Sequence, residues 1–162
     1  MIVCCKVSSP LGPLTLAAKD GALIGLWLEN QRYFRAGVPS DAPIEPQAAP
    51  FPQARAWLDA YFAGLHPPVD FPLRPQGTAF QRRVWQALTA IPYGKTASYG
   101  QLALALRSSA RAVGSAVGRN PLSILIPCHR VLGADGSLTG YAGGLENKKR
   151  LLRLEGALEE TP

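Results

Sequence analysis

The sequence predicts an α/β N-terminal domain with a small antiparallel sheet, followed by a mostly α-helical domain of the winged helix-turn-helix type. Three observations predict this order: short β-rich runs come first, helix-capping signals follow, and basic residues are concentrated in the second half. The 162 residues are 47% hydrophobic and 17% charged, which indicates a folded chain with room for one ordinary domain or two small ones. We place the division at Pro75, which gives domains of residues 1–75 and 76–162.

The first half contains β-rich runs, a loop and a helix, in that order. Turn-forming residues separate the runs and predict an antiparallel meander of Ile2–Val7, Leu14–Ala18 and Ala22–Leu28. The Pro- and Ala-rich residues 30–50 show no period and predict a long loop, whereas residues 52–63 carry apolar side chains at helical spacing. His66 lies in a Pro-rich linker and has no evident partner. We therefore expect this half to be a scaffold without chemistry of its own.

The second half begins with two helix-capping boxes. Thr78 with Gln81, and Ser98 with Gln101, have the spacing at which a hydroxyl and an amide satisfy the first N–H groups of a helix. A further short helix is expected over Ala110–Gly118, and the tight turn before it predicts a helix-turn-helix.

The remaining predicted elements lie before and after Cys128 in the sequence. The apolar run Ile124–Ile126 predicts a buried strand that Pro127 ends, because proline lacks the N–H that a ladder needs. Residues 131–139 predict a hairpin that could serve as a wing, and residues 145–155 predict the last helix.

Cys128, His129 and Arg130 follow that proline directly and suggest nucleophilic attack by sulfur. Neighbouring basic groups are expected to lower the pKa of the thiol below about 8.5. Adjacent side chains in extended chain point apart, so a bend or a water would have to carry the proton to His129. Glu155 in the last helical turn is electrostatically misplaced, which makes it the candidate partner of His129. The alternatives are a small buried hydrophobe at Cys128 and a solvated carboxylate at Glu155.

Charge separates the two halves. Residues 1–75 hold six Lys and Arg against six Asp and Glu, whereas residues 76–156 hold eleven against three. The net charge of +8 on the second segment favours docking of a polyanion there, and an evenly solvated basic surface is the alternative.

The cysteines and the apolar segments indicate in which cellular compartment the protein is expected. Three cysteines, with Cys4 and Cys5 adjacent, cannot form a disulfide framework and fit a reducing environment. The start of the chain lacks signal-peptide features, and no stretch approaches the ~20 apolar residues of a membrane span. We expect a cytoplasmic monomer without a membrane partner.

Residues 126–131, Ile-Pro-Cys-His-Arg-Val, resemble the active-site motif of the O6-alkylguanine-DNA alkyltransferases, also called methylated-DNA–protein-cysteine methyltransferases. Further segments match that family in order and separation: Arg111–Gly114, Arg119–Pro121, Tyr141–Leu145, Lys148 and Glu155-Gly156. The resemblance is dense from about Thr78 to Gly156 and thin before that. It implies a ribonuclease H-like first domain and a second domain that binds DNA.

The resemblance implies DNA repair by direct reversal. An alkyl group on the O6 of guanine, or on the O4 of thymine, would pass irreversibly to Cys128 without a cofactor and without turnover. His129 would act through a water as the base, Glu155 would hold His129, and Asn120 would tie the recognition helix to the active-site strand.

The resemblance also implies double-stranded DNA bound from the minor groove. The damaged nucleotide must be flipped out, because a thiol in a pocket cannot reach a stacked base. Tyr99 would help to rotate the nucleotide and donate toward the base, while Arg111 would fill the vacated place. The neighbours of Arg111 would lie in the groove, namely Ala110, Ala112 and Gly114. The pocket would be lined by Val131, Tyr141, Ala142, Gly143 and Lys148.

Two departures from the family and three other functions bear on this interpretation. The turn at residues 107–109 is about two residues shorter than the family's. Cys4, Cys5 and His66 do not reproduce the zinc cluster of some relatives, so we predict no metal.

An alkyltransferase-like binding module would lack Cys128. A thiol hydrolase would not need the basic half, and a transcription regulator would need a dimer interface that is not evident.

Overall fold

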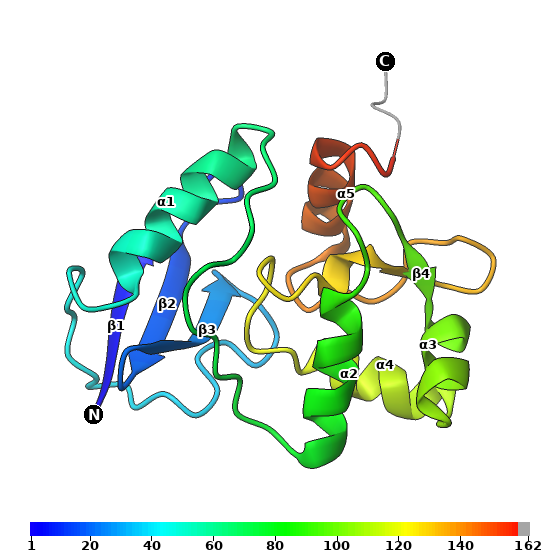
Figure 1. Ribbon diagram of the computed structural model, residues 1–162, viewed down its shortest axis with the longest axis horizontal. Helices are drawn as coiled ribbons and strands as arrows, with labels where there is room; N and C mark the ends of the chain where they lie inside the picture. Colours follow the sequence, from blue (N-terminus) through cyan, green and yellow to red (C-terminus); the bar gives the residue numbers. More distant parts are fainter. Residues whose placement is uncertain (159–162) are drawn as a thin grey trace.

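The computed structural model describes residues 1–158, and its first half opens on a three-stranded sheet. The strands lie in the order β1, β2, β3 and both pairs are antiparallel, so the predicted meander is confirmed (Figure 1). Their bounds are Ile2–Val7, Leu14–Lys19 and Ala22–Leu28. All seven residues of β3 are buried, which indicates that other segments cover this edge strand.

Two later segments close the open edge of β3. Leu23 forms an isolated parallel bridge with Leu73 of the linker, and Leu26 forms another with Leu122 of the second half. The Leu26 N–H donates to the Pro121 carbonyl at 2.8 Å, and the Ser123 N–H donates to the Leu26 carbonyl at 3.1 Å. These bonds satisfy backbone groups that an edge strand leaves unpaired. They also fix the segment before Cys128 against the first sheet.

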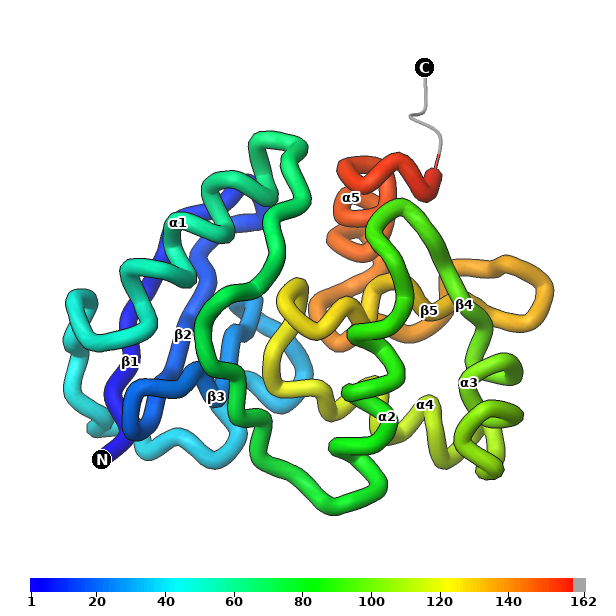
Figure 2. The backbone as a smooth tube through the Cα atoms, viewed as in Figure 1, coloured from blue at the N-terminus to red at the C-terminus, as the bar shows by residue number. Residues whose placement is uncertain are grey.

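Helix α1 (Phe51–Phe62) packs on the sheet after the predicted loop. The spacing of its buried residues, Phe51, Ala54, Leu58 and Tyr61, matches the apolar face expected from the sequence. Figure 2 follows the linker from the end of α1 to the start of the second half. His66 in this linker stacks on Tyr93, with ring centroids 4.4 Å apart, so the expectation that it lacks a partner is wrong.

Three helices and a short strand begin the second half. They are α2 (Ala79–Thr89), β4 (Ala97–Ser98), α3 (Tyr99–Leu106) and α4 (Ala110–Gly118). Both predicted capping boxes are present, at Thr78 and Ser98. Arg107 ends α3 in the left-handed region, with φ 54°, and Ser109 caps α4. A left-handed residue reverses the chain within a very short connection, which explains how α3 and α4 meet across so few residues.

The segment around Cys128 differs from the prediction. Residues 122–126 form a turn instead of a buried strand, with Ile124 at φ 72° and the Leu125 N–H bonded to the Ser123 carbonyl at 2.8 Å. Cys128–Arg130 then form a single 3-10 turn, η1. A short continuous apolar run is compatible with a buried turn as well as a strand, and here local hydrogen bonds decide for the turn.

The predicted hairpin at residues 131–139 is also wrong. Strand β5 (Val131–Leu132) pairs in parallel with β4, and no second strand follows it within residues 133–140. The Gly133 N–H still bonds the Ser137 carbonyl at 2.9 Å, which closes a loop without a ladder. The last helix, α5 (Leu145–Leu154), was expected.

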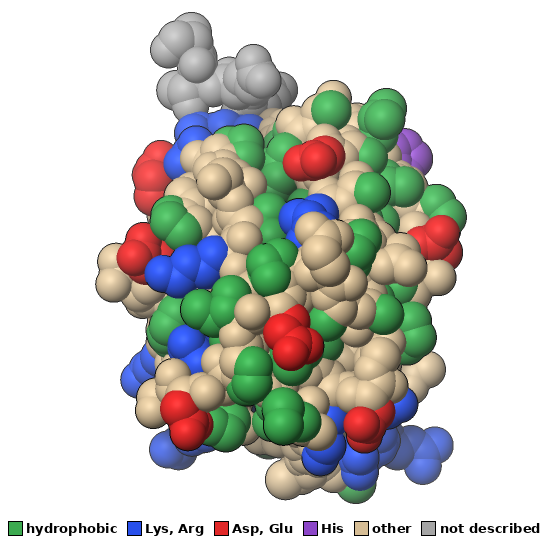
Figure 3. Space-filling view, turned by 90° about the vertical axis from the view of Figure 1, so that its left-hand side faces the viewer, with side chains coloured by type: hydrophobic (Ala, Val, Ile, Leu, Met, Phe, Trp, Pro, Cys, Tyr) green, Lys and Arg blue, Asp and Glu red, His purple; other side chains and the backbone are tan. Residues whose placement is uncertain are grey.

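One apolar core runs through both halves. It joins Leu26 and Tyr61 of the first half to Val84, Ile126 and Leu151 of the second. Within residues 1–158 no sheet continues from one half into the other, and no helix is long and apolar enough to cross a membrane. The outer face of the first half carries acidic and basic side chains intermixed, in keeping with its balanced charge (Figure 3).

Candidate active site

Cys128 lies at the start of η1 beside a cavity of about 330 Å³. Its backbone N–H donates to the Ile126 carbonyl at 2.7 Å, and only 3% of the residue is exposed. The cavity is lined from three parts of the chain: Arg32 and Tyr33 after β3, Tyr99 and Gly114–Gly118 on α3 and α4, and Gly140–Ala142. A volume of about 330 Å³ lies at the lower end of the usual range for small-molecule sites.

Asn120 fixes the segment that carries the thiol. Its Nδ2 donates to the Ile126 carbonyl at 2.8 Å, and its Oδ1 accepts the Leu122 N–H at 3.0 Å. Because Asn120 follows Arg119, the C-cap residue of α4, these two bonds couple the end of that helix to the turn before Cys128. The predicted tie between helix and active-site segment is therefore present, although the segment is a turn.

Lys148 of α5 holds the other side of the same region. Its ammonium is fully buried and donates to the carbonyls of Val131 at 2.5 Å, Thr139 at 2.9 Å and Gly140 at 3.4 Å. These bonds explain the missing hairpin, since the carbonyls of Val131 and Thr139 face one cation instead of a partner strand. Burial lowers the pKa of Lys148 to about 8, although the neighbouring thiol opposes that shift.

Burial, and not the basic neighbours, decides the pKa of the Cys128 thiol. It raises the pKa of Cys128 to about 11, and the hydrogen bond from Asn120 and the charge of Lys148 only partly offset it. The expectation of a lowered pKa is therefore wrong for the unliganded protein. The reason is that Arg130 directs its charge to Glu155, and burial outweighs the neighbours of Cys128 that favour the thiolate. A thiol in this state is protonated at neutral pH and needs a base in order to react.

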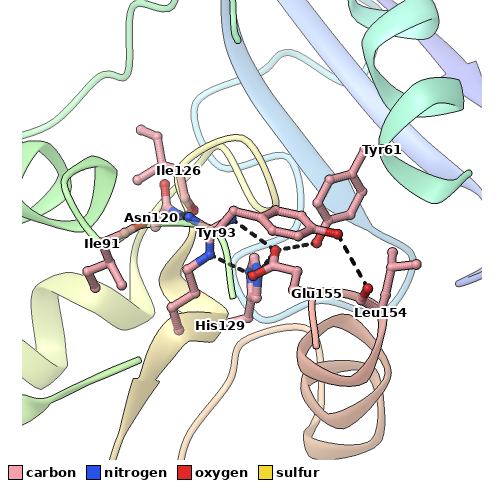
Figure 4. A network of polar contacts seen from close by, with 9 residues as sticks. Tyr61, Ile91, Tyr93, Asn120, Ile126, His129, Leu154 and Glu155 are labelled. Carbon is pink, nitrogen blue, oxygen red and sulfur yellow. Dashed lines mark hydrogen bonds and ion pairs between the residues drawn. The ribbon is translucent and has the colours of Figure 1, made fainter. Parts of the chain in front are cut away.

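His129 lies against Glu155, as expected from the sequence. Its Nε2 is 2.7 Å from Glu155 Oε2, and both side chains are completely buried (Figure 4). Burial lowers the pKa of His129, although the carboxylate opposes that shift. The imidazole is therefore neutral, and the carboxylate holds the proton on Nε2. Nδ1 is buried, without a hydrogen-bond partner among residues 1–158, and is left as the acceptor.

Glu155 accepts four hydrogen bonds. Besides His129, the Tyr61 hydroxyl donates to Oε2 at 2.6 Å, while Arg130 donates from Nε to Oε1 at 2.7 Å and from Nη2 to Oε2 at 3.0 Å. Burial alone would raise the pKa of Glu155, but these bonds and charges lower it to about 2. The four donors match the roughly four lone-pair sites of a carboxylate, so its charge is stable in the interior.

The remaining predicted residues fall into three groups. Tyr99, Gly114, Tyr141 and Ala142 line the cavity with Cys128. Val131, Gly143 and Lys148 lie around it without lining it. On the first turn of α4, Ala110 and Arg111 are exposed and Ala112 is half-buried.

Sequence reasoning missed contributions from the first half and from Arg130. Tyr61 contacts Glu155, and Arg32 and Tyr33 line the cavity, so the expectation that this half lacks chemistry is wrong. Tyr61 has the spacing of a core residue, and nothing nearby in sequence distinguishes its hydroxyl. Arg130 lies two residues after Cys128, and the sequence suggested an effect on the thiol, whereas its guanidinium binds Glu155.

A metal site is a separate question. Within residues 1–158, no group of three or more His, Cys, Asp or Glu side chains is arranged to hold a metal ion.

Comparison with known proteins covers nearly the whole chain. A family model described as 6-O-methylguanine DNA methyltransferase, ribonuclease-like domain, matches residues 2–75, and one described as the DNA binding domain of the same methyltransferase matches residues 79–157. The methylated-DNA–protein-cysteine methyltransferase of Mycobacterium leprae (strain TN) is 48% identical over 157 residues, covering 96% of this chain and 93% of the relative. That of Methanosarcina acetivorans is 41% identical over 165 residues, covering 92% and 95%. A crystal structure of Mycobacterium tuberculosis OGT in complex with DNA is similar at a TM-score of 0.86 and 44% identity, covering 96% of this chain and 93% of that one.

Proposed function

The chain belongs to the 6-O-methylguanine DNA methyltransferase family, and from this premise we propose that Cys128 is the cysteine that takes the alkyl group from damaged DNA. The activity of the protein is that of a methylated-DNA–protein-cysteine methyltransferase, which repairs DNA by direct reversal. One observation carries the residue assignment. Cys128 is the cysteine beside the cavity of about 330 Å³, whereas Cys4 and Cys5 are buried in β1.

The reaction is a displacement at carbon. Sγ of Cys128 bonds to the alkyl carbon while the bond from that carbon to O6 breaks, so guanine leaves with the electron pair. The thiol proton passes through a water to Nδ1 of His129, and the base regains a proton from the solvent or from Tyr99. Glu155 stabilises the imidazolium that forms, because its charge lies 2.7 Å from Nε2.

The environment of the thiol suits this order of events. A buried, protonated thiol reacts slowly with stray electrophiles, because its pKa of about 11 keeps the thiolate rare at neutral pH. The thiolate forms only when a water links it to His129. The product is a thioether, which has no good leaving group, so each protein molecule reacts once.

DNA is bound as a duplex, from the minor-groove side, with the damaged nucleotide flipped into the cavity. We assign Arg111 to the vacated place in the stack and Tyr99 to the rotation of the nucleotide. Support comes from the exposed position of Arg111 on α4 and from Tyr99 on the cavity wall. Helices α3 and α4 would act as the helix-turn-helix, with Ala110, Ala112 and Gly114 lying against the groove.

The unit that acts is a monomer in the cytoplasm that handles O6-alkylguanine and also O4-alkylthymine. The three free cysteines fit a reducing compartment. Residues 1–75 and 76–162 are proposed as two domains, with the net charge of +8 on residues 76–156 supplying most of the attraction to phosphate.

Peptide mapping after reaction tests the assignment. The protein is mixed with a duplex that carries one O6-methylguanine, digested, and searched for methylated cysteine. We expect the methyl group on the peptide that contains Cys128, and none in a Cys128→Ser variant. A methyl group on Cys4 or Cys5 with Cys128 unmodified would contradict the proposal.

A further inference from the structure

The loop after β3 carries two aromatic residues and two arginines at the mouth of the cavity. Tyr33 and Phe34 are each 40% exposed, and Arg32 and Arg35 flank them. We propose that Arg32 and Arg119, gathered on the ring of Tyr33, bind a backbone phosphate of the DNA strand that carries the lesion. This proposal rests on the function proposed above and assigns a DNA contact to the N-terminal half.

The loop is held against the active-site segments, so its arginines have a defined position. Buried Gln31 accepts the Leu28 N–H and the Ser123 hydroxyl through Oε1, both at 3.0 Å. The Arg32 N–H donates to the Ala142 carbonyl at 2.9 Å. The loop is therefore bonded to the turn before Cys128 on one side and to the cavity wall on the other.

Tyr33 brings two guanidinium groups together. Arg119 Cζ lies 4.3 Å from the centroid of its ring and Arg32 Cζ lies 5.7 Å from it. Attraction between the cations and the ring face holds both groups near an exposed surface. Tyr33 has φ 59°, a conformation that is uncommon for a bulky residue, which the anchored neighbours at Gln31 and Arg32 impose.

The two charges are not neutralised within the described chain. In residues 1–158 the ion pairs are those of His129 and Arg130 with Glu155, and the side chains of Arg32 and Arg119 make no hydrogen bond there. Two cations that share one aromatic ring and have no acidic partner favour an anion. A phosphate fits, because guanidinium groups bind its oxygens in a planar, bidentate geometry.

The position suits the lesion strand. Arg32 and Tyr33 line the cavity that contains Cys128, and Arg119 with Tyr33 lines the adjoining one. A nucleotide whose base reaches the thiol leaves its flanking phosphates at the cavity mouth. The geometry thus points to a phosphate next to the flipped nucleotide, between the loop after β3 and the C-terminal end of α4.

Binding without transfer tests this contact. In a Cys128→Ser background, the affinity for a duplex with one O6-methylguanine is measured at several salt concentrations. Each of Arg32→Ala and Arg119→Ala should weaken binding and reduce the slope of log affinity against log salt by about one. Single phosphates of the lesion strand are then replaced by uncharged methylphosphonates. At one position within about two nucleotides of the lesion, the replacement should weaken binding of the parent protein but should not weaken binding of the Arg32→Ala variant any further.

Arg35→Ala is the matched control. It removes the same charge from the same loop, but its guanidinium is engaged with the Pro39 carbonyl at 2.8 Å, so the salt slope should stay as in the parent. If the slope of log affinity against log salt falls equally for Arg35→Ala, the arginines act only through the overall positive charge of the loop, and the proposed phosphate contact is wrong. An unchanged slope for Arg32→Ala and Arg119→Ala, or additive losses at every phosphate, would also overturn the contact. Those results would leave the methyl transfer to Cys128 standing, whereas failure of that transfer would first appear in the peptide map of the unaltered protein.

Discussion

The two halves of the molecule contribute to the active site in different ways. In the second half the reacting groups follow one another along the chain: Cys128 and His129 occupy one 3-10 turn, and Glu155 ends the helix that packs against it. In the first half, Tyr61 and Tyr33 reach the site singly, from a core helix and from a loop. Reactive residues that lie near one another in the sequence can be recognised from the sequence alone. A residue that reaches the site through a single contact between the two halves cannot.

The difference extends to electrostatics. On the thiol side of η1, burial outweighs Asn120 and Lys148 and keeps the pKa of Cys128 at about 11, whereas the Glu155 side is saturated with donors and keeps the pKa of that carboxyl at about 2. A donor from the first half, Tyr61, takes part only on the saturated side. If this division is correct, variants on the two sides should differ in both size and kind of effect.

The largest effect is expected for His129→Ala. Without a base, transfer should slow by about 10²–10⁴-fold, the usual contribution of general-base catalysis. The pH profile should also change. The unaltered protein should keep its rate as pH falls below the ordinary value for histidine of 6.5, because burial lowers the pKa of His129. The variant must use pre-formed thiolate, so its rate should rise with pH toward the thiol's pKa of about 11.

Single-turnover rates on a methylated duplex between pH 5.5 and pH 9 measure both changes. Parallel pH profiles for the two proteins would show that His129 is a structural residue.

Glu155→Gln should lower stability, and it should also slow transfer because glutamine lacks the charge that stabilises the imidazolium of His129. The folded pKa of about 2, against an ordinary value of 4.5, corresponds to about 3 kcal/mol of stability at pH 7. A depressed carboxyl pKa stabilises the fold above the unfolded value, and that contribution is lost as pH falls from about 4.5 toward 2. Urea unfolding should therefore show a variant that is much less stable at pH 7, with a deficit that shrinks to below about 1 kcal/mol near pH 2.5. A deficit that does not change with pH would point to lost packing instead.

Arg111→Ala should weaken repair of duplex DNA by about 10–10²-fold, since unstacking a base costs a few kcal/mol that the arginine is proposed to offset. Free O6-benzylguanine has nothing to unstack, so its reaction should be much less affected. Rates on the two substrates give the comparison. Equal losses would mean that Arg111 supports the fold of α4.

The smallest effect is expected from the first half. Tyr61→Phe removes one of the four donors to Glu155 and should cost about 1–2 kcal/mol of stability. Transfer should slow by less than tenfold, because His129 and Arg130 still hold the carboxylate. Phe62→Leu, a half-buried neighbour on α1, controls for packing. A Tyr61→Phe loss as large as that of Glu155→Gln would contradict the division between the halves.

Local patterns account for what the sequence predicted correctly. The meander, the two capping boxes and the last helix are each specified by residues within a few positions of one another. The pairing of His129 with Glu155 was found because a carboxylate at a helix C-terminus opposes the local field.

The failures also have physical causes. Ile124 at φ 72° turns an apolar run that alone is compatible with a strand, and Lys148 draws together the carbonyls that a hairpin would have paired. The state of the thiol depends on burial, which no neighbouring residue type reveals. Tyr61 has the spacing of a core residue, so its hydroxyl could be assigned only with α5 and η1 in position.

The central claim is that Cys128 accepts one alkyl group and then stops. Intact-protein mass, followed while a duplex with O6-methylguanine is added in rising excess, tests it most directly. We predict a plateau at one methyl group per protein molecule, reached at one equivalent of lesion and unchanged by more DNA or longer incubation. Continued loss of lesion beyond one equivalent, with the protein returning to its original mass, would contradict the claim.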